Sequence, residues 1–490
     1  MKSSHGRQET LHTYVICTKT SSIIWFVNSF NSQTTNHFLD RIDNFIFKVI
    51  VYYSTLMKPN HHSTKHNSKW RNVIDYFQSE KIHLCSVMLG IALQPISTAT
   101  GNIGFGIALV ITLFRIPLLI PSWRTLVDQT WFRFLTVWLA WSFLSLLWSS
   151  DWGFGLMQFK ATRVLLWIPI LWPLRHRWWP LISSILIGTT LTQFMQASQI
   201  YFHWPLTKFG AGAGLTTPTQ TSLWDATAVG FWLMLAVLAS WKMAFATLPA
   251  AILAASGLVW AGTRAAALAL IVELIGSIIV IALIKKQWIK RVVICALVGI
   301  SILTGVYFLP HSQLSTKISN DSDASSITLA DGYVVNANVR VAMWKMALEG
   351  WTHYPIFGVG IGGIPNTIAK NIDAKDSRIE VDNKPFDLST VKMIHNTYVQ
   401  ILTESGIVGM GLFVAFIITF FAGALRSVQK DPVYIMTLGA SMLWFVAASF
   451  DGFCNSGGFL SVGAIVLTLS IRSEVNSDLR QVHNTDARLL

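Results

Sequence analysis

Apolar runs of about 20 residues follow one another through most of this chain, and this feature limits what the chain can fold into. A helix of that length matches the roughly 30 Å hydrocarbon core of a bilayer. Soluble domains do not carry such runs in series, and they contain about twice the 12% of charged residues found here. We therefore predict an all-α polytopic membrane protein. The 21 Trp agree with this class, because indole favours the headgroup boundary.

We predict twelve membrane spans from these runs. The fourth is short for a straight crossing, and we expect Trp178 and Trp179 to complete it. The predicted spans cover residues 83–100, 103–120, 131–149, 161–174, 180–200, 226–241, 244–261, 265–284, 292–309, 397–424, 432–449 and 457–471.

The basic residues indicate how these spans are oriented. A net charge of +13 could suggest nucleic acid, but the Lys and Arg residues form short clusters between apolar runs, so no nucleic-acid partner is predicted. With the basic N-terminal tail in the cytoplasm, the short inner loops hold ten Lys and Arg and the short outer loops hold four. This asymmetry follows the positive-inside rule and predicts twelve spans with both ends inside.

The span positions divide the chain into five parts. Residues 1–82 form a polar, basic cytoplasmic tail, in which Met57 is an alternative start that would leave 1–56 untranslated. Residues 83–309 hold the first nine helices, 310–396 form a large periplasmic loop with short helices, 397–471 hold the last three helices, and 472–490 form a cytoplasmic tail.

Two stretches of the predicted loop have structure of their own. Residues 340–351 place Val341, Trp344, Ala347, Leu348 and Trp351 on one helical face, which predicts a helix lying on the membrane surface or on the bundle. The glycines and Pro355 of 353–363 break regular structure and allow close backbone approach.

His395 and Asn396 stand where the predicted outer loop enters the tenth span. Asn396 could cap that helix. Neutral imidazole can take a proton near pH 7, so His395 is a candidate general base or a hydrogen-bond donor to a substrate. The alternative is an interfacial histidine that the loop holds in place.

Several cations are predicted on the same side as His395. Arg264 begins the eighth span among small residues, and its guanidinium could bind phosphate oxygens or snorkel to the interface. Arg340 begins the loop helix, where the alternative is a solvated charge. Arg163, at the predicted outer end of span four, and Lys208 would complete an electropositive rim suited to a polyanionic lipid headgroup.

Acidic residues give weaker signals. Glu404 and Glu273 lie inside predicted spans, where a carboxyl is either functional, with an arginine partner, or paired structurally within the bundle. Asp321 and Asp323 form a DxD pair in a Ser-rich stretch, for which a solvated loop is the better interpretation. The four Cys show no metal-ligand spacing, and we predict no metal site.

Three segments resemble the superfamily of O-antigen ligases and O-antigen polymerases. "HNTYVQILTESGIVGMGLF" is similar to its His-containing motif, "NVRVAMWKMALEGWTHYPIFGVGIGG" to its loop segment, and "GTRAAALAL" to its helix-start motif, in family order and spacing. The resemblance covers roughly residues 83–471. It implies about twelve helices with a large periplasmic loop, a multi-pass protein of the bacterial inner membrane, and a role in lipopolysaccharide biosynthesis.

The resemblance also implies an activity and its residues. The enzyme would transfer a glycan from undecaprenyl diphosphate at the periplasmic face, as a glycosyltransferase without metal or cofactor. Arg264 and Arg340 match the arginines expected to hold the diphosphate, His395 matches the residue expected to activate the acceptor, and Lys208 stands where the family often has an arginine. A ligase acting on lipid A–core is favoured over a polymerase acting on another lipid-linked unit or an enzyme that glycosylates a protein.

A transporter of a polyanionic lipid or solute is the main alternative from another class. It would need charged groups near the bilayer midplane and access from two sides, whereas most candidate residues here are predicted at one face. A structural scaffold would leave the outward cations unexplained.

Overall fold

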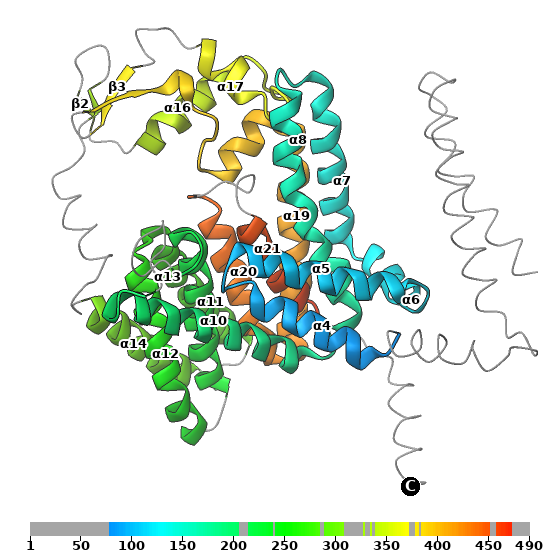
Figure 1. Ribbon diagram of the computed structural model, residues 1–490, viewed down its shortest axis with the longest axis vertical. Coiled ribbons are helices and arrows are strands. Elements are labelled where there is room, and N and C mark those ends of the chain that lie inside the picture. Colours follow the sequence, from blue (N-terminus) through cyan, green and yellow to red (C-terminus); the bar gives the residue numbers. More distant parts are fainter. Residues whose placement is uncertain are drawn as a thin grey trace, which may run out of the picture. The chain divides into compact units, whose positions relative to one another are not determined.

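The computed structural model describes residues 78–204, 214–238, 241–284, 289–307, 327–328, 334–335, 339–371, 378–381, 384–450 and 457–472 (Figure 1). Lys208, Asp321 and Asp323 lie outside these ranges, as do residues 1–77 of the predicted tail 1–82 and residues 473–490 of the predicted tail 472–490.

Apolar helices make up the first half of the described chain. They are α4 (Glu80–Leu93), α5 (Thr98–Phe114), α6 (Ile116–Val127), α7 (Thr130–Leu144), η1 (Ser145–Trp148), α8 (Trp152–Ala161), η2 (Thr162–Leu166), α9 (Trp167–Leu171), η3 (Trp172–Leu174), α10 (Trp178–Tyr201), α11 (Pro218–Leu238), α12 (Trp241–Ala261), α13 (Arg264–Ile284) and α14 (Ile289–Tyr307).

The second half contains short elements followed by three apolar helices. The short elements are β1 (Ile327–Thr328), β2 (Val334–Val335), α16 (Val339–Thr352), α17 (Ile364–Thr367), η5 (Ala369–Asn371), β3 (Arg378–Val381), β4 (Lys384–Asp387) and η6 (Leu388–Thr390). The later helices are α19 (Thr397–Lys430), η7 (Pro432–Tyr434), α20 (Ile435–Ala447) and α21 (Gly457–Leu469).

The apolar helices confirm a helical, multi-pass membrane protein. Within the described ranges, five helices are long and apolar enough to cross a membrane, or six if α5 and α6, which are bent by 102°, count as one span. Each of the twelve predicted spans overlaps a helix. The number of crossings and their orientation stay predictions, because α20 and α21 are shorter than a full span.

The prediction for the fourth span was wrong in one respect. The helical run that contains it begins at Trp152 and ends at Leu174, so α8 completes the span on its N-terminal side. Asp151 caps α8, since its carboxylate accepts a hydrogen bond from the Phe154 N–H at 2.9 Å. Trp178 begins the next helix instead. The hydropathy of the sequence does not show that the helix begins at Trp152, because the polar cap, Gly153 and Gly155 lower the hydropathy there.

The loop region contains two antiparallel hairpins, β1–β2 and β3–β4, which the all-helical prediction missed. In the longer hairpin, Arg378 pairs with Asp387 and Val381 pairs with Lys384. Such short strands carry too few residues to show a period of two in the sequence.

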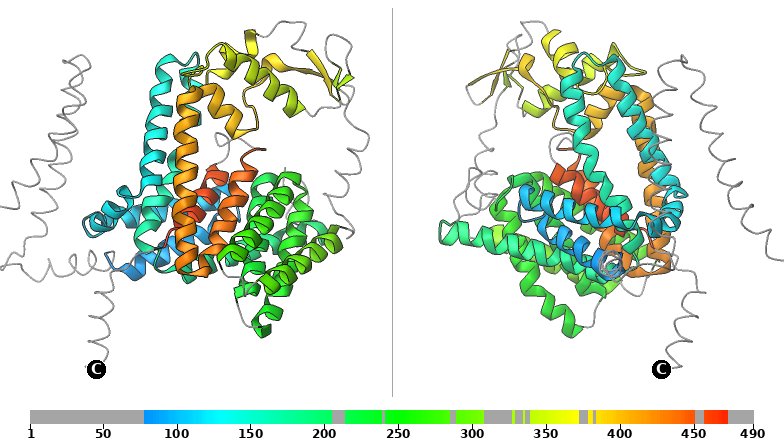
Figure 2. Two further views of the ribbon diagram at one scale, coloured as in Figure 1. Left: turned by 180° about the vertical axis from the view of Figure 1, so that it is seen from behind. Right: turned by 45° about the vertical axis from the view of Figure 1, so that its right-hand side comes forward.

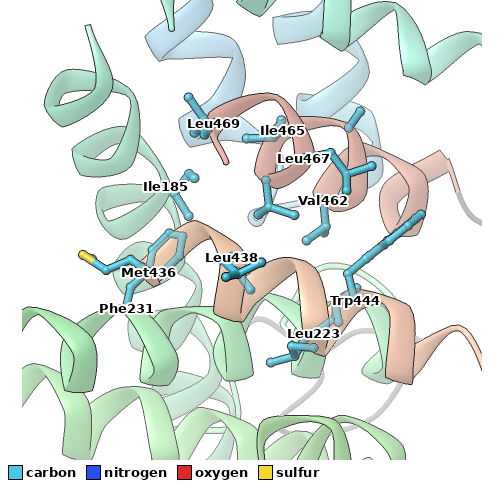
Figure 3. Packing of buried hydrophobic residues seen from close by; sticks show 14 of the residues in the cluster. Ile185, Leu223, Phe231, Met436, Leu438, Trp444, Val462, Ile465, Leu467 and Leu469 are labelled. Atoms are coloured by element: carbon cyan, nitrogen blue, oxygen red, sulfur yellow. The ribbon is translucent and has the colours of Figure 1, made fainter. Parts of the chain in front are cut away.

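Two hydrophobic clusters hold the described chain together. In the larger one, α20 packs between α21 and the pair α10 and α11, and Figure 3 shows Leu438 among side chains of these helices. The helices α7 and α19 lie side by side in the same cluster, as the views of Figure 2 show.

The smaller cluster buries one face of α16. That face consists of Met343, Met346 and Ala347, with Trp344 half-buried, whereas Val341 and Leu348 are exposed. The predicted apolar face of this helix was therefore only partly right. Two flexible Met side chains fill the interface in place of the branched residues that the hydropathy pattern favoured.

Candidate active site

The start of α19 is fixed by a side-chain cap and a strained residue. Asn396 Oδ1 accepts hydrogen bonds from the N–H groups of Tyr398 and Val399, both at 3.0 Å, which is the capping that its position in the sequence suggested. His395, directly before it, is half-buried and has φ of +50°. Non-glycine residues adopt this left-handed region rarely, and at a cost. The turn therefore holds the imidazole at a defined place beside the helix end.

The loop helix α16 is tied to this turn and to the end of α20. The Trp344 indole donates to the Ile394 carbonyl at 3.0 Å, and Arg340 Nη1 donates to the Phe450 carbonyl at 3.0 Å. The Thr397 N–H donates to the Ala448 carbonyl at 2.9 Å. Three chain segments thus meet at one place, because Arg340 and the start of α19, two residues after His395, both bond to the 448–450 turn.

Arg264 lies at the start of α13. The packing of α12 against α11 shows at which end of the helix bundle α13 begins. α12 ends at Ala261, only two residues before α13 begins. Gly257, near the end of α12, contacts the Asp225 carboxyl near the start of α11, so the two helices are antiparallel. Arg264 therefore lies at the end of the bundle where α11 begins.

The start of α11 leads back to the His395 turn. Gln220 contacts Gly458 at the start of α21, and the Trp444 indole donates to the Phe459 carbonyl at 2.8 Å. The start of α21 therefore lies against the end of α20, next to the 448–450 turn. Arg264, which is exposed, thus lies at the same end of the helices as Arg340 and His395. We call this end of the bundle the His395 end.

Two other candidate residues lie in different elements. Arg163 is exposed, but it lies in η2, eleven residues after the start of the run Trp152–Leu174, or about 16 Å of helix rise. It thus lies within this helical run rather than at either end of it, and its place in the electropositive rim stays a prediction. Glu273 is fully buried between α11 and α20, and neither carboxyl oxygen has a hydrogen-bond partner among the described residues. The arginine partner expected for it is not found there.

The glycine-rich loop after α16 inserts into a break in α19. Gly406 has φ of +64° and ψ of −168°, which interrupts the helix. The Thr403 and Glu404 carbonyls, which lose their partners at the break, accept the N–H groups of Val359 at 3.0 Å and Gly360 at 2.9 Å.

The loop also supplies acceptors for the other side of the break. The Ile407 and Val408 N–H groups donate to the carbonyls of Pro355, at 2.9 Å, and Ile356, at 3.3 Å. The Trp141 indole donates to the Ser405 carbonyl at 3.1 Å. All these backbone groups of the broken helix are therefore satisfied, as a membrane interior requires.

Glu404 holds the far end of this loop. Its Oε1 accepts the Gly362 N–H at 3.0 Å and lies 3.4 Å from Gln400 Nε2, and the residue is 4% exposed. The Ile361 N–H donates to the Ser145 hydroxyl at 3.0 Å, which joins the loop to η1 as well. Glu404 thus acts on the loop that follows α16, and its partner is a backbone N–H group rather than the expected arginine.

Residues 249–414 match the family model described as O-antigen ligase. This part of the chain is therefore similar to the O-antigen ligase family. The matched segment runs from α12 to the second part of α19, and it contains Arg264, Arg340, His395 and the glycine-rich loop. No curated protein matches the chain.

The family match confirms the resemblance found in the motifs. The match covers residues 249–414, and the apolar helices of the chain agree with a membrane protein. The first spans, α20 and α21 lie outside the matched segment, although the 448–450 turn that contacts Arg340 belongs to this unmatched part.

Proposed function

We propose that this protein transfers an oligosaccharide or polysaccharide from undecaprenyl diphosphate to an acceptor at the periplasmic face of the inner membrane, most simply as an O-antigen ligase acting on lipid A–core. In the reaction the acceptor hydroxyl attacks the anomeric carbon of the donor. A new C–O bond forms there, and the bond to the diphosphate breaks.

His395 serves as the general base in this proposal. The imidazole takes the proton of the attacking hydroxyl, which typically accelerates such a step by about 10²- to 10⁴-fold. The left-handed turn and the Asn396 cap fix the backbone that carries the ring, and a base held at a defined place needs little reorganisation at the moment of reaction.

Arg264 and Arg340 serve as the diphosphate site. Negative charge grows on the leaving diphosphate as the bond breaks, and guanidinium groups bind phosphate oxygens in a bidentate manner. Lys208, whose position is not described, could add a point charge.

One observation carries the proposal: the starts of α16 and α19 and the end of α20 meet at the His395 end, and the start of α13 reaches the same end. A cation from the loop helix, a cation from a spanning helix and an imidazole thus belong to elements that share one end of the helices, and all three lie in the segment that matches the family. This arrangement suits a single donor headgroup better than separate roles for the three residues.

The test uses His395→Ala in a strain that lacks the native gene. We expect transfer of the glycan to lipid A–core to be lost, by at least about 100-fold, with the protein still present in the membrane. The matched control is His353→Ala, because His353 is exposed at the end of α16 and plays no part in the proposal. Retained transfer in the first variant would remove the proposed base.

The acceptor is identified by the glycans of the null strain. Long chains that stay on undecaprenyl diphosphate indicate a ligase, core carrying a single unit indicates a polymerase, and an unmodified protein indicates the protein-glycosylating branch. Glycan transfer by the purified protein in detergent would show that the protein is an enzyme. A transporter has no activity there, because detergent solution does not provide two compartments.

A further inference from the structure

An exposed apolar surface surrounds residues 354–357 of the glycine-rich loop, which we call the loop tip. Ile356 and Phe357 are 54% and 55% exposed. A groove of about 670 Å³ beside them is lined by the loop tip and by side chains of α7 and η1, namely Trp141, Leu144 and Trp148. None of the described side chains that line the groove is charged. An apolar surface of this size on a loop marks a place where an apolar partner binds.

Ring contacts fix the position of the loop tip along α7. The Phe357 ring centroid lies 5.9 Å from that of Trp141 and 6.2 Å from that of Trp148. The Gly358 N–H donates to the Tyr354 carbonyl at 3.0 Å, which closes the tip into a turn. The loop tip therefore lies at the level of Trp148, where η1 ends.

The length of the helix indicates where the bilayer ends. The apolar run from Thr130 to Trp148 has about 28 Å of helix rise, close to the roughly 30 Å hydrocarbon core of a bilayer. An exposed ion pair between Arg133 and Asp128, at 3.1 Å, marks water at the first end of this run. Two serines follow Trp148 directly. One boundary of the bilayer therefore falls at the level of Trp148 and the loop tip.

The second part of α19 gives the same boundary independently. About 28 Å of helix rise separates Ile407, directly after the break, from the exposed Arg426. Ile407, Val414 and Ile418 are exposed along this part and form an apolar face. The Ile407 N–H bonds to the Pro355 carbonyl at 2.9 Å, which joins the loop tip to this end of the helix. Both helices thus place the loop tip at the membrane boundary rather than above it.

The side chains at this level favour lipid over a protein or a sugar. Trp148, Trp152 and Tyr354 are exposed, and Trp and Tyr favour the interface between bilayer and water. The groove continues the exposed apolar face of α7, on which Val137 and Leu144 lie. A protein interface would have a polar rim, and a sugar would need hydrogen-bonding groups in the groove. An acyl chain needs neither.

We infer that the loop tip, which belongs to the predicted periplasmic loop, inserts into the adjacent leaflet, and that an acyl chain of a bilayer phospholipid fills the groove beside Trp148. The lipid then supports the loop that satisfies the break in α19. This inference does not rest on the proposed transfer reaction, because it needs only the bilayer and the described contacts.

The first experiment measures the environment of the loop tip with nitroxide labels on single cysteines, using the full chain without its native cysteines in lipid nanodiscs. Ile356→Cys is the test. Val137→Cys is the lipid-facing control, and Glu349→Cys is the water-facing control, because the Glu349 side chain is 64% exposed beside Lys345. The ratio of collisions with O₂ to collisions with a water-soluble nickel chelate should be within about twofold of the ratio at 137 and at least about fivefold above that at 349.

The second experiment identifies the occupant of the groove. A phospholipid with a photoreactive group on its acyl chain should label peptides that contain residues 141–148 or 354–358. Leu144→Trp should lower this labelling at least about threefold, because the larger side chain occupies the space of the acyl chain. Leu147→Trp is the matched control, since Leu147 is exposed next to the groove but does not line it, and the labelling should stay unchanged. An excess of undecaprenyl phosphate should not displace the phospholipid.

Four results would overturn the inference. A collision ratio at 356 equal to that at 349 would place the loop tip in water. Shielding of position 356 from both reagents would show that a protein partner or a second copy of the chain covers it. Equal labelling of Leu144→Trp and Leu147→Trp would show that the groove is not occupied by the phospholipid. Displacement by undecaprenyl phosphate would assign the groove to an isoprenoid chain instead.

Discussion

At the scale of single residues, the site depends on how the chain holds His395. A left-handed conformation at a non-glycine residue costs on the order of 1 kcal/mol, and it persists only where neighbouring contacts impose it. Here the Trp344 indole fixes the Ile394 carbonyl on one side, and the Asn396 cap fixes the helix on the other. The strain and the proposed role thus belong to the same residue, which is common at functional sites.

Replacing His395 by Gly should therefore separate stability from activity. Glycine adopts positive φ without steric cost, so His395→Gly should be more stable than His395→Ala by about 1 kcal/mol. Both variants should be inactive, because neither carries an imidazole. Thermal unfolding in detergent, measured beside the transfer assay, checks this order. A glycine variant that unfolds at a lower temperature than the alanine variant would show that the turn is not strained.

At the scale of elements, the break in α19 couples the loop to the membrane-embedded part. Four hydrogen bonds between the loop and the broken helix replace the two that an unbroken helix would make from Ile407 and Val408 to the carbonyls four residues earlier. The loop in turn follows α16, which carries Arg340. The position of the proposed phosphate-binding cation is therefore linked to the helix that begins beside the proposed base.

Gly406→Ala should disrupt this coupling. A Cβ atom there would contact the Ile356 carbonyl oxygen, and φ of +64° is unfavourable for alanine. We expect a loss of about 2 to 4 kcal/mol and faster proteolysis of residues 353–363. Gly411→Ala is the control on the same helix, since a Cβ there has no heavy atom within 4 Å. It should change stability by less than about 1 kcal/mol. Equal effects of the two substitutions would contradict the described insertion.

The sequence predicted the helices better than the contacts between them. Apolar runs place each span within several residues, because burial in lipid imposes length and hydropathy locally. The insertion at Gly406 depends on a loop some 45 residues earlier in the chain, and no local pattern shows it.

The candidate residues were predicted in two ways, some from motifs and one from its position along an apolar run. Motifs around His395, Arg340 and Arg264 could be recognised, and the packing brings these residues to one end of the helices. The prediction for Arg163 depended on where a single helix begins, and the helical run begins eleven residues before it. A position defined by a motif is thus more secure than one defined by counting along an apolar run.

At the scale of the whole molecule, the account requires that the His395 end faces the periplasm. The donor lipid is presented on that side in the proposed reaction, so all three residues must be accessible from it. The positive-inside pattern predicts this orientation, provided that an even number of crossings separates the two cytoplasmic tails.

The most direct measurement is the accessibility of single cysteines at positions 264, 340 and 395, in a background where Cys17, Cys85, Cys295 and Cys454 are replaced. A membrane-impermeant maleimide is added to spheroplasts, with a cysteine at Arg426 as the inward control. We predict that the three positions react before the membrane is permeabilised and that position 426 reacts only afterwards. Protection of any of the three until permeabilisation would contradict a common periplasmic site.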